Sequence, residues 1–557
     1  MKNIITIACI FTVSFIIPSC LDVDPPGRYS DEQVWASIRN LDYSIRGFYQ
    51  DAFYSSYVSE LSAPERASDG FADLFKATRG SMATNRFFSV VDWLNVNNTL
   101  SPWDASYASI NRMNDFLVAY NDGVGDELDH NELSIRVAEV RFLRAFIYQT
   151  LVIRHGGVIL RIDETRLDGP ERAMKARAST DECWDFIIEE YEKAALILPE
   201  EWVIPTVEYG RLTKGSAYGM IARAALYAGR WDKAIEAAGE VTKLAEEGRY
   251  QLLPNFANIF TTANNKELLT TVYYSSNNGH LWDNHFCPSG DQQVFGTIYI
   301  GGLIQPTDEF ASSYDIKVGA TWRTFSWDDV ENGIITDPWA NRDPRFAATF
   351  LYNGAVWRNR PLQLYVGGQD GFIQYAETGL EDMRRSVTGY VLRKFLSTEI
   401  NWTNIQRSKE YWVIMRYAEV LLIKSEAHAR KGEMTQAYEY LNQVRTRAGM
   451  PALPQRVNWD GYFRDLQKER ICELGGEGHR FWDLRRWGIA ADVLNGSRTH
   501  GVRITRTVDD NDVASFSYQR VEADVSDRMF PEKYNIFPIP DSEVQRNTLC
   551  EQDNIWK

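Results

Sequence analysis

The segment from Arg416 to Gly449 reads RYAEVLLIKSEAHARKGEMTQAYEYLNQVRTRAG and decides the fold. It predicts two helices joined at Gly432, because small residues let antiparallel helices approach closely and glycine accepts the positive φ of the turn. This logic is typical of a tetratricopeptide helix pair. A helical hairpin unrelated to any repeat is the alternative, because the second copy lies far away in the chain. The shared spacing joins Ala427, Gly432, Ala437 and Leu441 in one copy and Ala224, Gly229, Ala234 and Ala238 in the other.

Four more helices are predicted before the first of these pairs. A capping box that begins at Ser30 opens a helix through Tyr49. Ser101 followed by proline and an acidic residue predicts a helix to about Tyr120. A third is expected over 132–154, and a fourth from a cap at Thr180 to the residue before Pro199.

The helical period fades between residues 251 and 412. This stretch is rich in glycine, asparagine, threonine and aromatic residues. Alternating apolar residues predict short strands at 271–274 and 363–366, and residues 497–525 form a second strand-and-loop insertion. Long non-helical insertions on a rigid scaffold are where binding residues usually lie.

The N-terminus has the features of a targeting segment. The apolar run from Ile4 to Ile17 is too short to cross a bilayer and fits a secretory signal peptide over residues 1–19. Ile17-Pro18-Ser19-Cys20 resembles a bacterial lipobox, which implies that Cys20 carries lipid and that residues 20–29 form a tether. An ordinary signal peptide with a chance cysteine is the alternative.

Composition excludes several classes of function. The chain has 557 residues and a net charge of −16, which argues against binding to nucleic acid or to anionic lipid. The cysteines after Cys20 are scattered without a CxxC spacing, so the fold is not expected to depend on a disulfide. They are Cys183, Cys287, Cys472 and Cys550.

Several blocks in the last third carry a resemblance to a known family. They are Glu469-Arg470-Ile471-Cys472-Glu473-Leu474, Glu477-Gly478-His479-Arg480-Phe481-Trp482-Asp483-Leu484-Arg485-Arg486-Trp487 and Phe537-Pro538-Ile539-Pro540. Earlier blocks agree, at 138–146, 211–215, 343–346, 388–390 and 393–395. In this order they resemble the SusD/RagB family of surface nutrient-binding lipoproteins.

The resemblance implies a mainly α fold, with tetratricopeptide-like helix pairs forming a right-handed scaffold that carries loop and short-strand insertions. Residues 30–250 would be the N-terminal helical part. Residues 251–557 would be the C-terminal part, with the loop-rich insertion at about 251–412. It also implies a place on the cell outer membrane beside a TonB-dependent SusC-like transporter that takes up oligosaccharide.

The charges between Glu469 and Arg486 are interpreted as scaffold. Both signs are packed together there, which suits a network of arginine–carboxylate pairs, and neighbouring arginines would lower the pKa of a catalytic acid. The sequence has no HExxH, P-loop or GxSxG motif. No catalytic residue, metal or cofactor is therefore predicted.

Binding of sugars is the function that remains. A flat aromatic ring covers the apolar face of a sugar, and amide or carboxylate groups satisfy its hydroxyls. The resemblance to SusD-like proteins implies a ligand platform built from an early aromatic loop and from the long insertion. The candidate residues are Asp69, Arg79, Trp93, Asn97, Trp282, Tyr299, Trp322 and Trp327. For each tryptophan, a structural place in the core is the alternative interpretation.

Two rival functions stay open at this level. On the same scaffold the ligand could be a peptide or another nutrient. In a different class, the chain could be an all-helical glycoside hydrolase. Paired carboxylates such as Asp69 and Asp73 could mimic a glycosidase pair, but every acidic protein contains such pairs.

Overall fold

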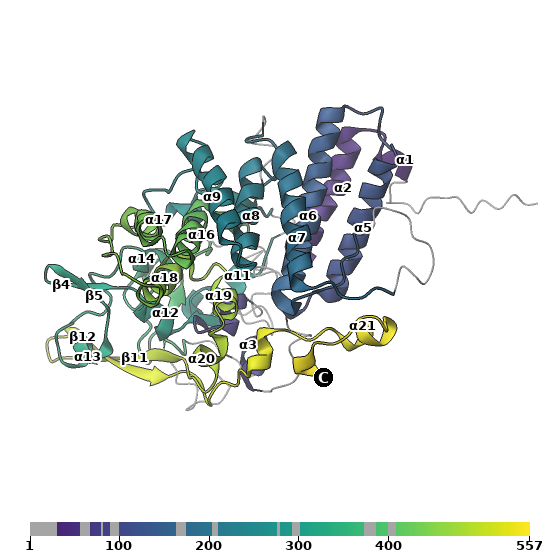
Figure 1. The fold of residues 1–557 in the computed structure, drawn as a ribbon. Coiled ribbons are helices and arrows are strands. Elements are labelled where there is room, and N and C mark those ends of the chain that lie inside the picture. Colours follow the sequence, from purple (N-terminus) through teal and green to yellow (C-terminus); the bar gives the residue numbers. More distant parts are fainter. Residues whose placement is uncertain are drawn as a thin grey trace, which may run out of the picture.

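Long helices in a row of neighbouring pairs form one side of the molecule, and short strands and loops gather on the other (Figure 1). This computed structural model describes residues 31–55, 67–78, 82–89, 100–162, 174–202, 210–275, 279–291, 301–371, 386–398 and 408–557. Within these ranges the strands form only two-stranded sheets. The predicted mainly α class is confirmed.

The helices of the scaffold follow one another in chain order. They are α1 (Asp31–Val34), α2 (Ile38–Gln50), α5 (Trp103–Asn121), α6 (His130–His155), α7 (Thr180–Ile197), α8 (Lys214–Tyr227), α9 (Trp231–Glu246), α16 (Tyr417–Arg430), α17 (Met434–Arg447) and α18 (Trp459–Leu474). The C-terminal helices are α19 (Arg480–Arg486), α20 (Ala490–Leu494) and α21 (Asp541–Arg546). The last part of the chain, which leads into α21, passes beneath the N-terminal helices (Figure 1).

The two matching sequence copies are neighbours in space. They form the pairs α8–α9 and α16–α17, and α9 packs directly against α16. The long insertion therefore leaves the scaffold after one pair and returns at the next. Strand β2 (Leu268–Val272) near its start pairs antiparallel with β10 (Trp412–Arg416) at its end, and β10 runs straight into α16.

The remaining elements are short. The helices are α3 (Ala83–Ser89), α10 (Asn258–Thr261), α11 (Trp282–Phe286), α12 (Asp308–Ser312), α13 (Trp327–Glu331) and α14 (Phe346–Thr349). The strands are β1 (Phe75–Ala77), β3 (Ile304–Pro306), β4 (Ile316–Val318), β5 (Thr321–Arg323), β6 (Phe350–Leu351), β7 (Val356–Trp357), β8 (Arg360–Pro361), β9 (Val391–Leu392), β11 (His500–Val508) and β12 (Ala514–Glu522). There is a π-helical turn, η1 (Asp51–Ser55), and 3-10 turns are η3 (Ser68–Phe71), η5 (Ser289–Asp291), η7 (Glu532–Asn535) and η8 (Asn554–Trp556).

Local capping chemistry shifts several predicted helix starts. The predicted first helix is split, and α2 begins after Ser37, whose hydroxyl accepts from Asn40 N at 3.2 Å. The cap of α7 is Ser179, one residue earlier than predicted, because it forms a reciprocal capping box with Glu182. Pro102 occupies the cap of α5 rather than its first turn.

The predicted strands are borne out in part. Residues 271–272 belong to β2, whereas residues 363–366 form no strand, although Val366 N donates to Ile504 O at 2.9 Å beside β11. The insertion at 497–525 is a hairpin of β11 and β12, paired over nine residues each.

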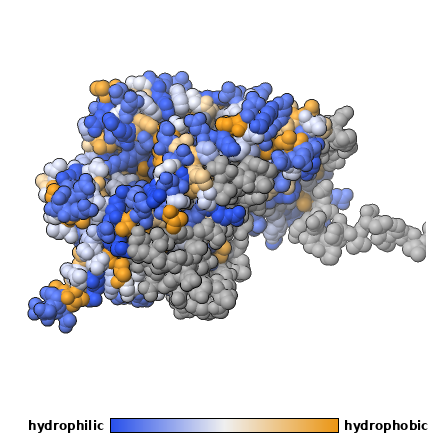
Figure 2. Space-filling model, turned by 90° about the horizontal axis from the view of Figure 1, so that it is seen from below, coloured by the Kyte–Doolittle hydropathy of each residue, from blue (hydrophilic) through white to orange (hydrophobic). Residues whose placement is uncertain are grey.

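Apolar packing rather than cross-linking holds the scaffold together. The four cysteines after Cys20 are free and buried. No helix among the described residues combines the length and apolarity needed to cross a bilayer. Seen from below, the coloured part of the surface is mainly hydrophilic, with apolar residues in small groups (Figure 2).

Candidate functional site

A buried ion-pair network joins the charged blocks of the sequence. Arg345, fully buried, contacts Glu469 at 2.6 Å and Glu473 at 2.9 Å on α18. Arg416, at the end of β10, contacts Glu473 at 2.6 Å and Glu477 at 2.7 Å. These ion pairs therefore connect α18 with Arg345 of the insertion and with Arg416 of strand β10.

The same pairs fix the ionisation of the carboxyl groups. Burial alone would raise the pKa of Glu473, but Arg447, Arg416 and Arg345 hold it far below its usual range. Burial also opposes ionisation of Asp483, yet Arg470 and Arg486 lower its pKa to about 2. A general acid must hold a proton near neutral pH, so this cluster suits a scaffold and not acid catalysis.

Three of the predicted ligand-binding residues, Trp282, Trp327 and Asp69, are buried and make contacts within the fold. The Trp282 ring is fully buried and lies on Phe286 with 4.1 Å between ring centroids. Trp327 is 8% exposed and donates from Nε1 to Asp308 Oδ1 at 2.9 Å. Neither ring has a free face for a sugar, which corrects the expectation for both.

Asp69 is also a structural residue. It is 1% exposed and accepts hydrogen bonds from the backbone nitrogens of Gly476, Gly478 and Arg480 at 2.9, 3.1 and 3.0 Å. Burial raises its pKa to about 6, and these bonds oppose the shift. Its carboxyl group orders the turn that leads into α19, so the expectation that it contacts a ligand is corrected.

Of the predicted aromatic residues that the structure describes, Trp322 keeps an accessible surface. It lies half-buried in β5, opposite Lys317 of β4. Arg79, Trp93, Asn97, Tyr299 and the lipidation candidate Cys20 lie outside the described residues.

The β11–β12 hairpin brings further aromatic residues to the insertion. Phe516 is 38% exposed and lies 5.8 Å from the ring of Tyr365, and Tyr518 meets Trp339 edge to face at 5.7 Å. The alternation in ASFSYQRVE (514–522) signals a strand, but which segment it would meet depends on tertiary packing.

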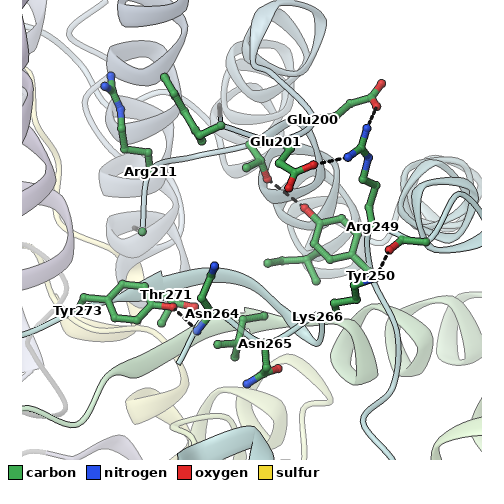
Figure 3. Close-up of a pocket in the computed structure, with 16 residues that line it drawn as sticks. Glu200, Glu201, Arg211, Arg249, Tyr250, Asn264, Asn265, Lys266, Thr271 and Tyr273 are labelled. Atoms are coloured by element: carbon green, nitrogen blue, oxygen red, sulfur yellow. Dashed lines mark hydrogen bonds and ion pairs between the residues drawn. The ribbon is translucent and has the colours of Figure 1, made fainter. Parts of the chain in front are cut away.

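A cavity of about 340 Å³ lies elsewhere, at the ends of α7, α8 and α9. Arg211 and Tyr273 lie on one side, with Arg249 and Tyr250 on the other (Figure 3). The lining residues are Glu200, Glu201, Trp202, Gly210, Arg211, Thr213, Gly248, Arg249, Tyr250, Asn264, Asn265, Lys266, Leu268, Leu269, Thr271 and Tyr273.

Close backbone packing shapes this cavity. Thr213 caps α8, and its hydroxyl also bonds the Tyr250 hydroxyl at 3.0 Å. A Cβ on Gly215 would lie 2.2 Å from that hydroxyl, so glycine is needed where Tyr250 crosses the first turn of the helix. Gly210, at φ +79°, lies over Thr271 and Tyr273 of the β2 segment.

The aromatic wall of the cavity is fixed. Trp202 Nε1 donates to Leu212 O at 2.9 Å, and the Arg211 guanidinium lies 4.0 Å from the ring centroid. Arg211 is held in turn by the buried Glu139, which it contacts through Nε at 3.0 Å. An ion pair with a buried carboxylate, Arg211 with Glu139, therefore holds one wall of the cavity in place.

The residues of the cavity come from separate segments of the chain, at 200–202, 210–213, 248–250 and 264–273. No short motif unites them, and sequence reasoning missed the site. The only local signal is that polar and aromatic residues follow the ends of two predicted helices.

Two family models match the chain. One, described as SusD family, covers residues 266–556, and the other, described as starch-binding associating with outer membrane, covers residues 21–226.

Individual proteins match along most of their length. SusD-like protein P25 from Formosa agariphila is 22% identical over 89% of this chain and 91% of its own. The structure of a SusD-like carbohydrate binding protein from Bacteroides fragilis superposes with a TM-score of 0.75 at 24% identity, covering 92% of this chain and 99% of that one. Surface glycan-binding protein A from Bacteroides uniformis gives a TM-score of 0.62 at 21% identity, covering 93% and 100%. These structural likenesses show a shared fold.

Proposed function

The chain belongs to the SusD family, and from that premise we propose that it binds glycans at the cell surface and releases them chemically unchanged. The observation that carries the proposal is the match of the family model to residues 266–556, more than half of the chain. The second family description, starch-binding associating with outer membrane, supports both the ligand class and the location.

The names of similar structures favour carbohydrate over peptide. One is called a carbohydrate binding protein and another a surface glycan-binding protein. In this chain, Trp322, Tyr365 and Phe516 offer partly exposed rings on the insertion side. A ring of this kind covers the apolar face of a sugar at low conformational cost. Our proposed platform consists of Trp322 together with Arg79, Trp93, Asn97 and Tyr299.

The proposal includes an anchor and a partner. Cys20 would carry lipid after removal of residues 1–19. Residues 20–29 would tether the N-terminal helical part (30–250) and the C-terminal part with its loop-rich insertion (251–557) to the outer membrane. A TonB-dependent SusC-like transporter would receive the glycan. Weak, reversible contacts suit this transfer, because a ligand held too tightly would not be released.

Electrophoresis of the purified protein through gels that contain laminarin, starch, xylan or mannan tests the ligand class. We expect one of these polysaccharides to retard migration. Trp322→Ala should weaken the retardation about tenfold, as expected for loss of an aromatic anchor. Tyr43→Ala, which removes an exposed ring from α2, should leave it unchanged.

The same polysaccharides test for catalysis. After prolonged incubation with the protein, no new reducing ends should form. Release of reducing ends would overturn the proposal and favour a hydrolase. Retardation by none of the polysaccharides, with binding of peptides instead, would overturn the ligand class.

A further inference from the structure

We infer that the cavity between Trp202, Tyr250 and Tyr273 is a second saccharide site, which takes the terminal one or two sugar units of a neutral glycan. The inference rests on the proposed function for its ligand class. The cavity shares no lining residue with the proposed platform. Its volume of about 340 Å³ falls in the range of small-molecule sites, at the lower end.

A threonine hydroxyl in the cavity wall provides the first polar group that a ligand could contact. Thr271 is 6% exposed and lines the cavity, yet its side chain has no hydrogen-bond partner among the described residues. Thr271 Oγ1 is not one of the fully buried oxygen atoms that lack a partner, so the cavity leaves this hydroxyl accessible. A ligand hydroxyl in the cavity would satisfy it.

Asn264 provides a second polar group beside the first. Its backbone has φ +52°, and its nitrogen donates to the Tyr273 hydroxyl at 3.0 Å, which fixes the residue at the edge of the cavity. Asn264 is exposed and lines the cavity, and its side-chain amide can both donate to and accept from a ligand.

The charges of the lining favour a neutral ligand. Arg249 is paired with Glu201 and lies 3.7 Å from Glu200. Arg211 is paired with Glu139. The third cation, Lys266, donates to Gly248 O at 2.9 Å. The two arginines are thus paired with carboxylates and the lysine with the backbone, so an anionic ligand would have to displace an existing contact, whereas a polyhydroxyl ligand would not.

A groove next to the cavity can hold the rest of a longer glycan. It has a volume of about 600 Å³ and shares Glu200, Glu201, Trp202 and Arg249 with the cavity. Beyond it, Leu196 and Ile197 at the end of α7 are 76% and 47% exposed. A terminal sugar in the cavity could therefore extend into the groove as part of a longer glycan.

Fluorine NMR of protein labelled with 5-fluorotryptophan separates this site from the platform. Trp202→Phe and Trp322→Phe assign one resonance to each. The probes are maltose, cellobiose, laminaribiose, xylobiose and mannobiose, with galacturonic acid and alanyl-alanine as charged comparisons. We expect at least one neutral disaccharide to shift the Trp202 resonance and the charged compounds to leave it unmoved.

Matched variants test the polar groups. Thr271→Val and Asn264→Gly should each weaken the Trp202 response about fivefold to tenfold, the effect of one lost hydrogen bond. Glycine at 264 keeps the positive φ. Thr270→Val is the control: Thr270 is the adjacent residue of β2, is buried and does not line the cavity, and its response should match the unaltered protein.

Different failures lead to different conclusions. A Trp322 shift without a Trp202 shift would overturn the second site and leave the proposed function standing. A Trp202 shift with galacturonic acid or alanyl-alanine alone would overturn the neutral ligand class. An undiminished Trp202 response in both variants would also overturn the inference. If no compound moves either resonance and the polysaccharide gels show no retardation, the proposed function fails as well.

Discussion

Individual charged residues determine how the insertion is held to the scaffold. Arg345 lies within hydrogen-bond distance of Asp343, Glu469 and Glu473, all of them buried. Inside a protein, the attraction between such groups must offset the loss of their hydration. Removing one cation from the set leaves several buried carboxylates without compensation.

Arg345→Gln should therefore destabilise the protein by about 3–5 kcal/mol. Urea unfolding followed by circular dichroism measures the change in free energy. Arg456→Gln is the control, because Arg456 is half-exposed and its pair with Asp465 is 3.4 Å long. The control should stay within about 0.5 kcal/mol of the unaltered protein. Equal effects of the two substitutions would contradict a structural role for the buried network.

The raised pKa of Asp283 predicts that the stability of the protein depends on pH. Burial raises its pKa to about 7, against the opposing hydrogen bond from Ser397. Between about pH 4 and pH 7 the unfolded chain releases this proton while the folded chain keeps it, so the free energy of unfolding falls as pH rises.

Asp283→Asn should remove this part of the pH dependence. Between pH 5 and pH 8 the unaltered protein should lose about 2 kcal/mol of stability relative to the variant. Urea unfolding of both proteins at the two pH values measures this difference, and all other titrating groups cancel in the comparison. A difference that does not change with pH would show that Asp283 titrates normally.

At the scale of elements, the turn glycine of each helix pair sets the geometry. Gly432, between α16 and α17, has φ +82°, and a Cβ there would meet no atom within 4 Å. The requirement is therefore conformational and not steric. Gly239, inside α9, also has open space around it but lies in a regular helix.

Replacing each of these two glycines by alanine should change the stability of the protein in opposite directions. Gly432→Ala should destabilise the protein by about 1 kcal/mol, because alanine avoids the left-handed conformation. Gly239→Ala should stabilise it by up to about 1 kcal/mol through its higher helix propensity. Thermal unfolding of both variants measures the two shifts. Stabilisation by Gly432→Ala would mean that the turn tolerates another conformation.

At the scale of the whole molecule, the row of scaffold helices is continuous in space although a long insertion interrupts it in the sequence. The pairs α8–α9 and α16–α17 adjoin, and the β2–β10 ladder closes the insertion at its base. The insertion can thus vary without breaking the row of helices. The proposed platform and the proposed second site would then contact separate points of one glycan chain.

The proposed anchor also belongs to this scale. In cells that process lipoproteins, the unaltered protein should fractionate with outer membranes, and Cys20→Ala should move it to the soluble fraction, because several acyl chains supply the membrane affinity. Immunoblotting of the fractions measures the distribution, and Cys550→Ala, which changes a buried cysteine far from the N-terminus, is the control. Persistence of the Cys20→Ala variant in membranes would refute a lipid anchor at this position.

The sequence allowed the helices to be predicted more reliably than the site. Helices α5 to α9, α16 and α17 are encoded locally by caps, small residues and a 3.6-residue period. Tryptophan in a loop-rich segment carries no such local signal. Trp282 and Trp327 became core anchors, and only the partners around a ring decide whether one of its faces stays free.

The amino-acid sequence by itself determined the helix pairs, the place of the insertion and the family, because each depends on residues close together in the chain or on blocks in a fixed order. Tertiary structure alone decided which charges pair, which aromatic rings stay exposed and where a cavity forms. Those outcomes depend on contacts between residues that are more than a hundred positions apart, such as Asp69 with Gly476 and Arg416 with Glu267. Burial of polar groups is the physical reason: a carboxylate or hydroxyl is structural or free to bind a ligand according to whether the folded chain supplies its partner.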